Sequence, residues 1–449
     1  MAGRAGGAGD RVVIIGGGST GALAAVRLAE RGFRVTTLEK AAIGNGSSSR
    51  SSACIRAQFG VAETIIGMRY SEWWYSHFHE ILETLPADTQ PVIRQNGYLF
   101  LYEDPDHAAA SRWHAGAVPP AALRSAAAEA WDRARERAAL QQDLGVPVEV
   151  LEPDEVARRW PHIEADRLIG ATWCAEDGFL APHLIYGEGF RRARELGVEV
   201  RQGVEVTNAF LRDGRIVALE TTDGPVAGDW FVNATNAWAP RVSTWLGGME
   251  LAIAPTKRYL YTLRPDEPIM SAEEWDRLPM TIYGLAPGRG ACSRPDGPQL
   301  LLTWSHETDP EPDFTDADQD RISPGFNHAH GTENHGYAIL EQIDAFAPRL
   351  AECGGLTATA SGYYAMTPDA NPLIGKDWRV PNLVHAAGFS GHGLMHAPIT
   401  AVMVEAIIAG DAVDGRVRLP APFDAHTIDL AAFNPGRDFS LTRHEAMVL

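Results

Sequence analysis

The chain has 449 residues, of which 45% are hydrophobic and 22% charged, and its formal net charge is −19. This composition is typical of a folded globular protein and excludes fibrous, disordered and disulfide-built chains. The negative charge disfavours nucleic acid and anionic lipid as partners, because both bind through clustered Lys and Arg. The four cysteines form no CxxC pair, so we predict neither a disulfide framework nor a metal site.

Residues 1–10 carry a positive charge but no apolar stretch, and we expect a flexible tail rather than a secretory signal. No run of the sequence approaches the ~18 to 20 apolar residues of a membrane span. We therefore expect a cytoplasmic protein with no membrane partner.

A nucleotide-binding pattern follows the tail. The β-branched run 11–15 predicts a buried parallel strand, and the glycine turn 16–21 (GGGSTG) leads from it into a helix-compatible stretch that ends before Gly32. A second strand, 34–38, ends at Glu39, close to the ~20-residue offset expected for an acid that binds ribose hydroxyls. Glycines admit a diphosphate and the helix N-terminus favours its charge, so the pattern predicts a dinucleotide site, FAD or NAD rather than NADP.

The next stretch, 44–60 (GNGSSSRSSACIRAQFG), is rich in small hydroxyl residues and contains Arg50 and Arg56. Such a loop can hydrogen-bond a long ligand, or it can be a solvated linker. The Ala-rich region 107–144 predicts exposed helices broken at Pro119 and Pro120.

The middle of the chain alternates helix and strand patterns. We expect an amphipathic helix over 182–196, a hairpin at Asp213–Gly214 and an apolar strand ending in small residues over 229–239. Strands over 253–305 indicate a separate antiparallel sheet. The polar stretch 307–336 contains three histidines near Glu333, for which a surface loop is favoured over a metal site by its prolines and glycines.

Near the end, residues 386–401 (AAGFSGHGLMHAPITA) place three glycines before an apolar stretch. The alternatives are a surface turn, or a loop that brings backbone against a flat ligand and directs a helix end towards it. Because proline is poorly tolerated inside a helix, Pro398 predicts a helix that starts near His396 or Ala397. The residues expected on its buried side are Ile399, Val402, Met403, Ala406 and Ile407.

Three separated motifs carry a resemblance over nearly the whole chain. The glycine turn with Glu39, the segment FVNATNAWAP at 231–240, and the pair YYAMTPDANPLIG and AAGFSGHGLMHAP at the carboxyl end resemble the D-amino-acid-oxidase-like (DAO) FAD-dependent oxidoreductases, which include sarcosine oxidase, glycine oxidase and dimethylglycine dehydrogenase. The resemblance is closest to the branch of sarcosine oxidase β-subunit-like enzymes and the mitochondrial FAD-dependent oxidoreductase-domain protein.

The resemblance implies a mixed α/β fold in which a Rossmann-like FAD domain is interleaved with an antiparallel-sheet substrate domain. The FAD domain would comprise 11–90, 150–245 and 355–449, and the substrate domain 91–149 and 246–354. The loop 388–393 would lie beside the isoalloxazine ring, with the following helix N-terminus stabilising reduced flavin by ~0.3 to 1 kcal/mol.

The resemblance also implies a set of FAD contacts. Attachment is expected to be non-covalent, because Gly362 and Ser51 stand where some relatives carry the Cys or His that bonds the flavin. Asn236 replaces a family glycine, and Asn is the residue that best tolerates positive φ after glycine. The expected FAD-contacting residues are Gly16, Gly18, Ser19, Thr20, Gly21, Glu39, Lys40, Ser47, Ser48, Arg50, Ser51, Ser52, Ala53, Val206, Ala234, Thr235, Trp238, Gly362, Gly391, His392, Gly393, Leu394 and Met395.

The implied chemistry is oxidation of the C–N bond of a small amine or amino acid, secondary or N-methyl amines in particular, with electrons passed to O2 or another acceptor. Met395 replaces a lysine that binds the substrate carboxylate in sarcosine-type oxidases, and Leu302 stands near the position of a lysine that promotes oxygen reduction. The substrate-site candidates are Arg56, Tyr259, His306, Tyr363, Met395 and His396. Two alternatives stay open: oxidation of a 2-hydroxy acid with His306 or His396 as base, and a non-catalytic, FAD-stabilised assembly or binding factor.

Overall fold

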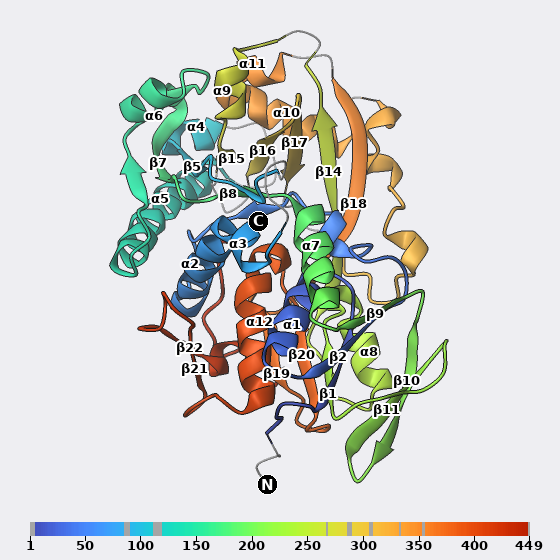
Figure 1. The fold of residues 1–449 in the computed structure, drawn as a ribbon. Coiled ribbons are helices and arrows are strands. Elements are labelled where there is room, and N and C mark those ends of the chain that lie inside the picture. The colour runs from blue at the N-terminus through green and yellow to red at the C-terminus, as the bar shows by residue number, and fades with distance from the viewer. Residues whose placement is uncertain are drawn as a thin grey trace.

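A computed structural model describes residues 5–84, 90–110, 119–265, 268–284, 290–304, 309–331, 334–352 and 355–447. Within them, strands far apart in the sequence form two large sheets (Figure 1). The six-stranded sheet has the spatial order β19 (Leu373–Lys376), β20 (Leu383–Ala387), β13 (Trp230–Asn233), β1 (Arg11–Ile15), β2 (Arg34–Glu39) and β9 (Glu199–Gln202). Its strands are parallel except β19, which runs antiparallel to β20.

The six-stranded sheet is covered on both faces, as parallel sheets are. Val12 and Ile14 face the helical side, and Val13 and Ile15 pack with residues of a three-stranded sheet on the other side. The helices are α1 (Ser19–Glu30), α7 (Pro182–Glu195) and α12 (Gly393–Ala409), and the small sheet comprises β10 (Val206–Arg212), β11 (Arg215–Thr221) and β12 (Val226–Ala227). The predicted strand, helix and strand of the glycine motif are therefore confirmed, as is the hairpin at Asp213–Gly214.

The eight-stranded sheet is largely antiparallel, with β15 and β5 as its parallel pair. Its order is β18 (Leu356–Met366), β14 (Ala254–Leu263), β17 (Gln299–Trp304), β16 (Ala291–Asp296), β15 (Met280–Tyr283), β5 (Tyr98–Glu103), β7 (Leu168–Cys174) and β6 (Glu149–Leu151). Helices at its outer face and edge are α4 (Pro105–Ala110), α5 (Pro120–Asp143), α6 (Pro153–Arg159), α9 (Ala272–Asp276), α10 (His335–Phe346) and α11 (Pro348–Ala351).

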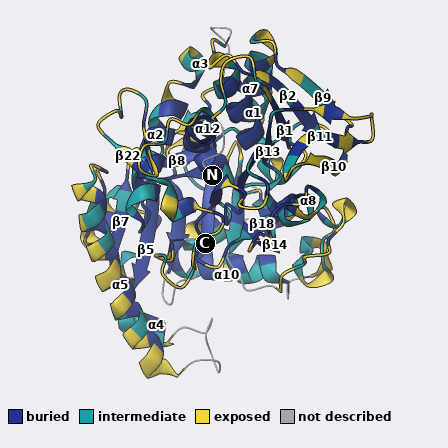
Figure 2. Ribbon diagram, turned by 90° about the horizontal axis from the view of Figure 1, so that it is seen from below, coloured by how far each residue is buried: buried dark blue, intermediate teal, exposed yellow. Residues whose placement is uncertain are grey.

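Further elements lie outside the two large sheets. They are α2 (Ala62–Ser76), α3 (Phe78–Ile81), α8 (Ala239–Trp245), the three-stranded sheet of β3 (Cys54–Ile55), β8 (Gly178–Leu180) and β4 (Ile93–Arg94), and the pair β21 (Arg416–Arg418) and β22 (Thr427–Asp429). Strands of both sheets are buried at the centre, whereas the outer faces of α4 and α5 are exposed (Figure 2). No helix in the described part of the chain has the length and apolarity needed to cross a membrane.

The predicted domain boundaries differ from the sheet membership in two places. We placed 150–245 and 355–449 with the nucleotide-binding sheet, but β7 in the first range and β18 in the second pair within the eight-stranded sheet. Pairing between strands distant in sequence decides this membership, and no local pattern reports it. The division into two domains otherwise stays a prediction.

The start of α12 also differs from the prediction. The helix begins at Gly393, three residues before the expected start, so Pro398 lies inside it and leaves the Leu394 carbonyl without its helical donor. The hydroxyl of Tyr75, on α2, donates a 2.6 Å hydrogen bond to that carbonyl and replaces the missing bond. The predicted buried residues of this helix are all buried, and the helix is buried on nearly every side.

Candidate active site

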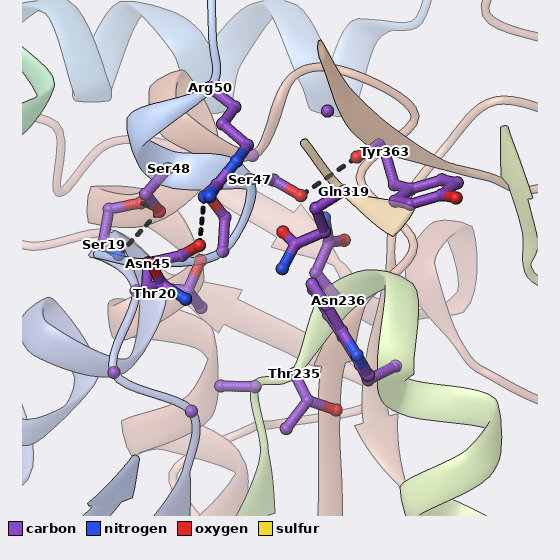
Figure 3. A pocket seen from close by; sticks show the side chains of 18 of the residues that line it. Ser19, Thr20, Asn45, Ser47, Ser48, Arg50, Thr235, Asn236, Gln319 and Tyr363 are labelled. Atoms are coloured by element: carbon purple, nitrogen blue, oxygen red, sulfur yellow. Dashed lines mark hydrogen bonds between the residues drawn. The ribbon is translucent and has the colours of Figure 1, made fainter. Parts of the chain in front are cut away.

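A cavity of about 350 Å³ lies at the carboxyl ends of the central parallel strands, between the six-stranded and the eight-stranded sheet. Its walls include four separated parts of the sequence: the glycine turn, the serine-rich loop, the end of β13 and the loop before α12. Figure 3 shows polar side chains from the first three of these parts, together with Gln319 and Tyr363, around one space. The convergence of both ends of the chain on one cavity is the arrangement expected from the motifs.

The glycine turn forms one wall without side chains. Gly16 has φ +115°, and a Cβ there would lie 2.6 Å from the Ala234 carbonyl oxygen. The Glu39 carboxylate accepts hydrogen bonds from the backbone N–H groups of Gly17 (2.7 Å) and Ala41 (2.9 Å), which fix it at the cavity edge. A narrow backbone-lined slot with an anchored carboxylate beside it suits a diphosphate next to a ribose.

The serine-rich loop lies over the start of α1. The Ser48 hydroxyl accepts from the Ser19 N–H at 3.1 Å, and Ser47 donates to the Tyr363 carbonyl at 2.9 Å (Figure 3). Arg50 pairs in a two-pronged arrangement with Asp320. The loop is thus held to both sheets and is not a free linker.

The end of β13 meets the loop before α12 through a single polar link. Asn236 has φ +49°, so the expected positive φ is confirmed, and its side-chain oxygen accepts from the Phe389 N–H at 3.4 Å. Gly391 has φ +91°, and a Cβ there would lie 2.4 Å from the Tyr364 ring. The first turn of α12, Gly-Leu-Met-His, contains no acidic residue, so its positive end faces the cavity uncompensated.

A smaller pocket of about 40 Å³ adjoins this end of the cavity and shares Tyr364, Gly391 and Leu394 with it. Arg56, which is 2% exposed, lines it with its guanidinium over the Phe59 ring at 3.9 Å. Its hydrogen bonds run to the backbone carbonyls of Gln58 and Met447, and none of the described carboxylates forms an ion pair with it. A buried guanidinium with neutral partners only is a site for an anion.

Two histidines lie beside Arg56. Burial, with the Arg56 charge next, holds the pKa of His392 well below its usual range, and burial lowers the pKa of His396 to about 4. Both are therefore neutral at pH 7, and Arg56 supplies the positive charge of this pocket. His392 lines the pocket, whereas His396 packs between the Phe59 and Phe389 rings.

A family comparison identifies the architecture. The model of the FAD-dependent oxidoreductase (DAO) family matches residues 11–407. The chain belongs to this family. FAD is the cofactor that the DAO family implies.

Several known proteins are similar to this chain over most of its length. FAD-dependent oxidoreductase domain-containing protein 1 of Xenopus laevis is 25% identical, over 96% of this chain and 82% of the relative. Glycine oxidase of Geobacillus kaustophilus is 24% identical, over 88% and 92%. The crystal structure of L-proline dehydrogenase from P. horikoshii matches with a TM-score of 0.74 and 24% identity, covering 96% of this chain and 97% of that one.

The cavity of this DAO-family chain fits FAD on structural grounds. The slot beside Gly16 admits a ligand group only because no side chain fills it, and Glu39 is already oriented by two backbone donors. Across the cavity, the Gln319 side-chain oxygen is buried without a hydrogen-bond partner. An orphaned buried acceptor indicates a missing donor, such as a bound ligand supplies.

Most of the FAD contacts expected from the sequence line the main cavity. Four do not. Gly21 packs inside α1 under the Gly16 carbonyl, Ala53 uses both backbone groups in bonds to Ser51 and Leu180, and His392 lies in the smaller pocket. Met395 also lines only the smaller pocket, where it was expected as a substrate-site residue as well.

The substrate-site candidates separate into two groups. Arg56 and Met395 line the smaller pocket, and the Tyr363 backbone lines the main cavity while its ring points away from the serine loop (Figure 3). Tyr259 stacks on Phe326 on the opposite face of β14, because alternate residues of a strand face opposite ways. His396 is in the core, and His306 lies outside the described residues.

Several lining residues were not among the substrate-site candidates. Tyr364, next to the predicted Tyr363, lines both pockets, and Arg258 does the same from β14. Thr303, not Leu302, faces the cavity from β17. Side chains alternate between the two faces of a strand. Thr303 and Arg258 could therefore be predicted as lining residues if the sequence showed which face of β17 and β14 is turned towards the cavity. Among the described residues, no cluster of His, Cys, Asp or Glu is arranged to hold a metal ion.

Proposed function

We propose that this DAO-family chain binds FAD non-covalently and oxidises the C–N bond of a small amine that carries a carboxylate. Bound FAD would accept a hydride at N5 from the C–H next to nitrogen, and water would hydrolyse the resulting imine. The observation that carries the proposal is the buried Arg56, whose charge has no carboxylate partner among the described residues and which lines the small pocket at the α12 end of the cavity.

The residues that line the two pockets would have three roles. The turn 16–21 and the start of α1 would hold the diphosphate, and Glu39 the adenosine ribose. Gly391, Gly393 and the α12 N-terminus would lie against the redox ring and favour negative charge there. Arg56 would hold the substrate carboxylate, while Tyr98, Met280 and Met395 exclude water around it.

No protein base is required if the amine binds in its neutral form, since the hydride leaves with its electron pair and the nitrogen lone pair stabilises the cation. A 2-hydroxy acid would instead need a base for the hydroxyl proton. Of the histidines near the pocket, His392 lines it. Of the two bases named for that alternative, His396 is in the core and His306 lies outside the described residues.

The test is anaerobic mixing of the purified holoprotein with N-methylglycine, glycine, L-proline and 2-hydroxy acids. Bleaching of the flavin absorbance by the amines supports the proposal, and bleaching by hydroxy acids alone favours the alternative. If no compound bleaches the flavin, the non-catalytic reading of the fold is favoured. Reoxidation of the reduced protein in air, compared with reoxidation by a quinone dye, then separates an oxidase from a dehydrogenase.

Arg56→Met tests the role of the guanidinium in the same assay. For a carboxylate-bearing amine we expect the second-order rate of flavin reduction to fall by at least about thirtyfold, because losing one partner of a buried charge pair costs about 2 kcal/mol or more. The methyl ester of the same amine is the matched control, and its rate should change little. Equal losses for acid and ester would show that Arg56 acts only by holding the Gln58 and Met447 backbone.

A further inference from the structure

The segment 309–323, here called the acidic strap, crosses from the eight-stranded sheet to the cavity. It carries six acidic residues in its first twelve positions: Asp309, Glu311, Asp313, Asp316, Asp318 and Asp320. Thr315, Asp316 and Gln319 line the main cavity, so the strap is part of the wall that encloses it. The strap was expected only as part of a polar loop.

The strap backbone is anchored to the substrate-domain side. Lys257, which is buried on β14, donates to the Asp318 carbonyl at 2.6 Å and to the Arg321 carbonyl at 3.0 Å. The Ser361 hydroxyl on β18 donates to the Gln319 carbonyl. The two Lys257 hydrogen bonds therefore hold the strap backbone against β14.

The strap side chains reach the opposite wall. Asp320 accepts two hydrogen bonds from Arg50, at 2.8 and 2.9 Å, and Asp316 pairs with Lys40 and accepts from the Trp238 indole N–H at 3.1 Å. Arg50, Lys40 and Trp238 all line the cavity themselves. Ion pairs between the two walls therefore join the strap to the nucleotide-binding half across the cavity. Both carboxylates are exposed, at 70% for Asp320 and 57% for Asp316, so solvent and salt reach the pairs.

Gln319 is the strap residue that enters the cavity. It is 3% exposed, its side-chain oxygen has no hydrogen-bond partner, and its amide projects into the space between Ser47 and Asn236 (Figure 3). Leaving a buried acceptor unpaired is unfavourable unless a ligand supplies the donor. FAD offers such donors on its ribityl and ribose hydroxyls, its adenine amine and its flavin N–H.

We infer that the acidic strap is a latch over the cofactor: Gln319 binds FAD directly, and the Asp316–Lys40 and Asp320–Arg50 pairs must part before FAD enters or leaves. This inference rests on FAD occupying the main cavity. The free energy needed to break the two ion pairs adds to the barrier for FAD uptake and to the barrier for FAD release. The two carboxylates also repel an incoming diphosphate. Removing them therefore speeds both uptake and release and changes the Kd much less, whereas removing the Gln319 amide speeds release alone.

The experiment measures FAD uptake and release with the full chain. Apoprotein is titrated with FAD for the Kd, uptake is followed by flavin fluorescence, and release by rapid gel filtration of diluted holoprotein. For Asp316→Asn/Asp320→Asn we expect both rates to rise about three- to tenfold, and for Gln319→Leu the release rate and the Kd to rise about tenfold. Raising the salt concentration should speed release from the wild-type chain in the same way, a check that needs no variant to fold.

Asp309→Asn/Asp313→Asn is the matched control, because it removes the same charge from the strap at two exposed side chains without a described ion pair. Its rates should stay within twofold of the wild type. If the Asp316/Asp320 variant behaves like this control, and salt has no effect on release, the latch is overturned. If the wild-type chain takes up no FAD at all, the cofactor assignment fails and the latch with it.

Discussion

The Tyr75 hydroxyl and the Leu394 carbonyl form a 2.6 Å hydrogen bond that lets a proline sit inside α12, a helix that is buried on nearly every side. Pro398 cannot donate to Leu394, four residues before it, and α2 supplies the donor from outside the helix. The bond also ties α2 to the end of α12 that faces the cavity.

Tyr75→Phe should lower the free energy of unfolding by about 1 to 3 kcal/mol, because it leaves the Leu394 carbonyl buried and unpaired. Urea unfolding of the apoprotein measures the loss. In a Pro398→Ala background the restored N–H can pair with Leu394, so the same change should cost clearly less. Equal costs in both backgrounds would contradict this role for the tyrosine.

Gly21 and Gly18 should differ sharply although both belong to the glycine motif. A Cβ on Gly21 would lie 2.1 Å from the Gly16 carbonyl oxygen, whereas a Cβ on Gly18 would meet only the Ser48 hydroxyl, at 3.0 Å. We expect Gly21→Ala to lose about 3 kcal/mol or more by overpacking, and Gly18→Ala less than about 1 kcal/mol. Comparable urea midpoints for the two apoproteins would argue against the tight packing of α1 on the turn.

Asp369, in the TPD motif, forms a buried two-pronged pair with Arg437 of the carboxyl-terminal segment, at 2.6 and 2.8 Å. Burial is the largest single influence and opposes its ionisation, but the hydrogen bonds from Arg437, Thr442 and the Asn371 N–H, together with the Arg437 charge, hold the pKa of Asp369 below its ordinary value. The pair therefore stabilises the fold fully above about pH 3.9, and this contribution is lost as the pH falls through the lower folded pKa.

At pH 7 we expect Asp369→Asn to cost about 3 to 5 kcal/mol, since it leaves the Arg437 charge buried and unpaired. The double variant Asp369→Leu/Arg437→Met should recover part of that loss. The single variant should also show a shallower decline in stability below about pH 3.9 than the wild type. An unchanged acid profile in the single variant would show that the pair does not titrate as described.

Glu72 on α2 is buried beside Asp177, which accepts from the Ala57 N–H and from Gln58 next to Arg56. Burial, followed by the Asp177 charge, raises the pKa of Glu72 well above its usual range. The folded chain therefore keeps this carboxyl protonated, and stability falls as the pH rises above the unfolded value of about 4.3.

Glu72→Gln mimics the protonated acid and should remove that decline. We expect the variant to gain stability relative to the wild type as the pH rises above about 4.3, by up to about 1.4 kcal/mol per pH unit. Glu63→Gln, on the same helix but partly exposed, is the control and should show no such trend. Parallel pH profiles for the wild type and Glu72→Gln would mean that Glu72 is ionised in the fold.

The elements that were predicted correctly from the sequence are those whose conformation depends on a few neighbouring residues. The turn 16–21 needs positive φ and close backbone contact, which only glycine gives cheaply, and Asn236 adopts the positive φ that its residue type tolerates. The start of α12 was misplaced because the donor that compensates for Pro398 comes from Tyr75, 323 positions earlier along the chain.

In the candidate site, too, some features were predictable from the sequence and others were not. By itself, the sequence determined that a nucleotide fold is present and that Glu39 lies at its edge, since both depend on spacing within a short segment. The place of the carboxyl-terminal glycine loop in the same site came from the family resemblance, because its own spacing also fits a surface turn. Only the tertiary structure decided that Tyr259 faces away, that Tyr364 and Gln319 face inward, and that Arg56 is left without a carboxylate among the described residues. Those outcomes depend on which face of a strand is covered and on which distant loop lies over it, and both are set by pairing and packing across the whole chain.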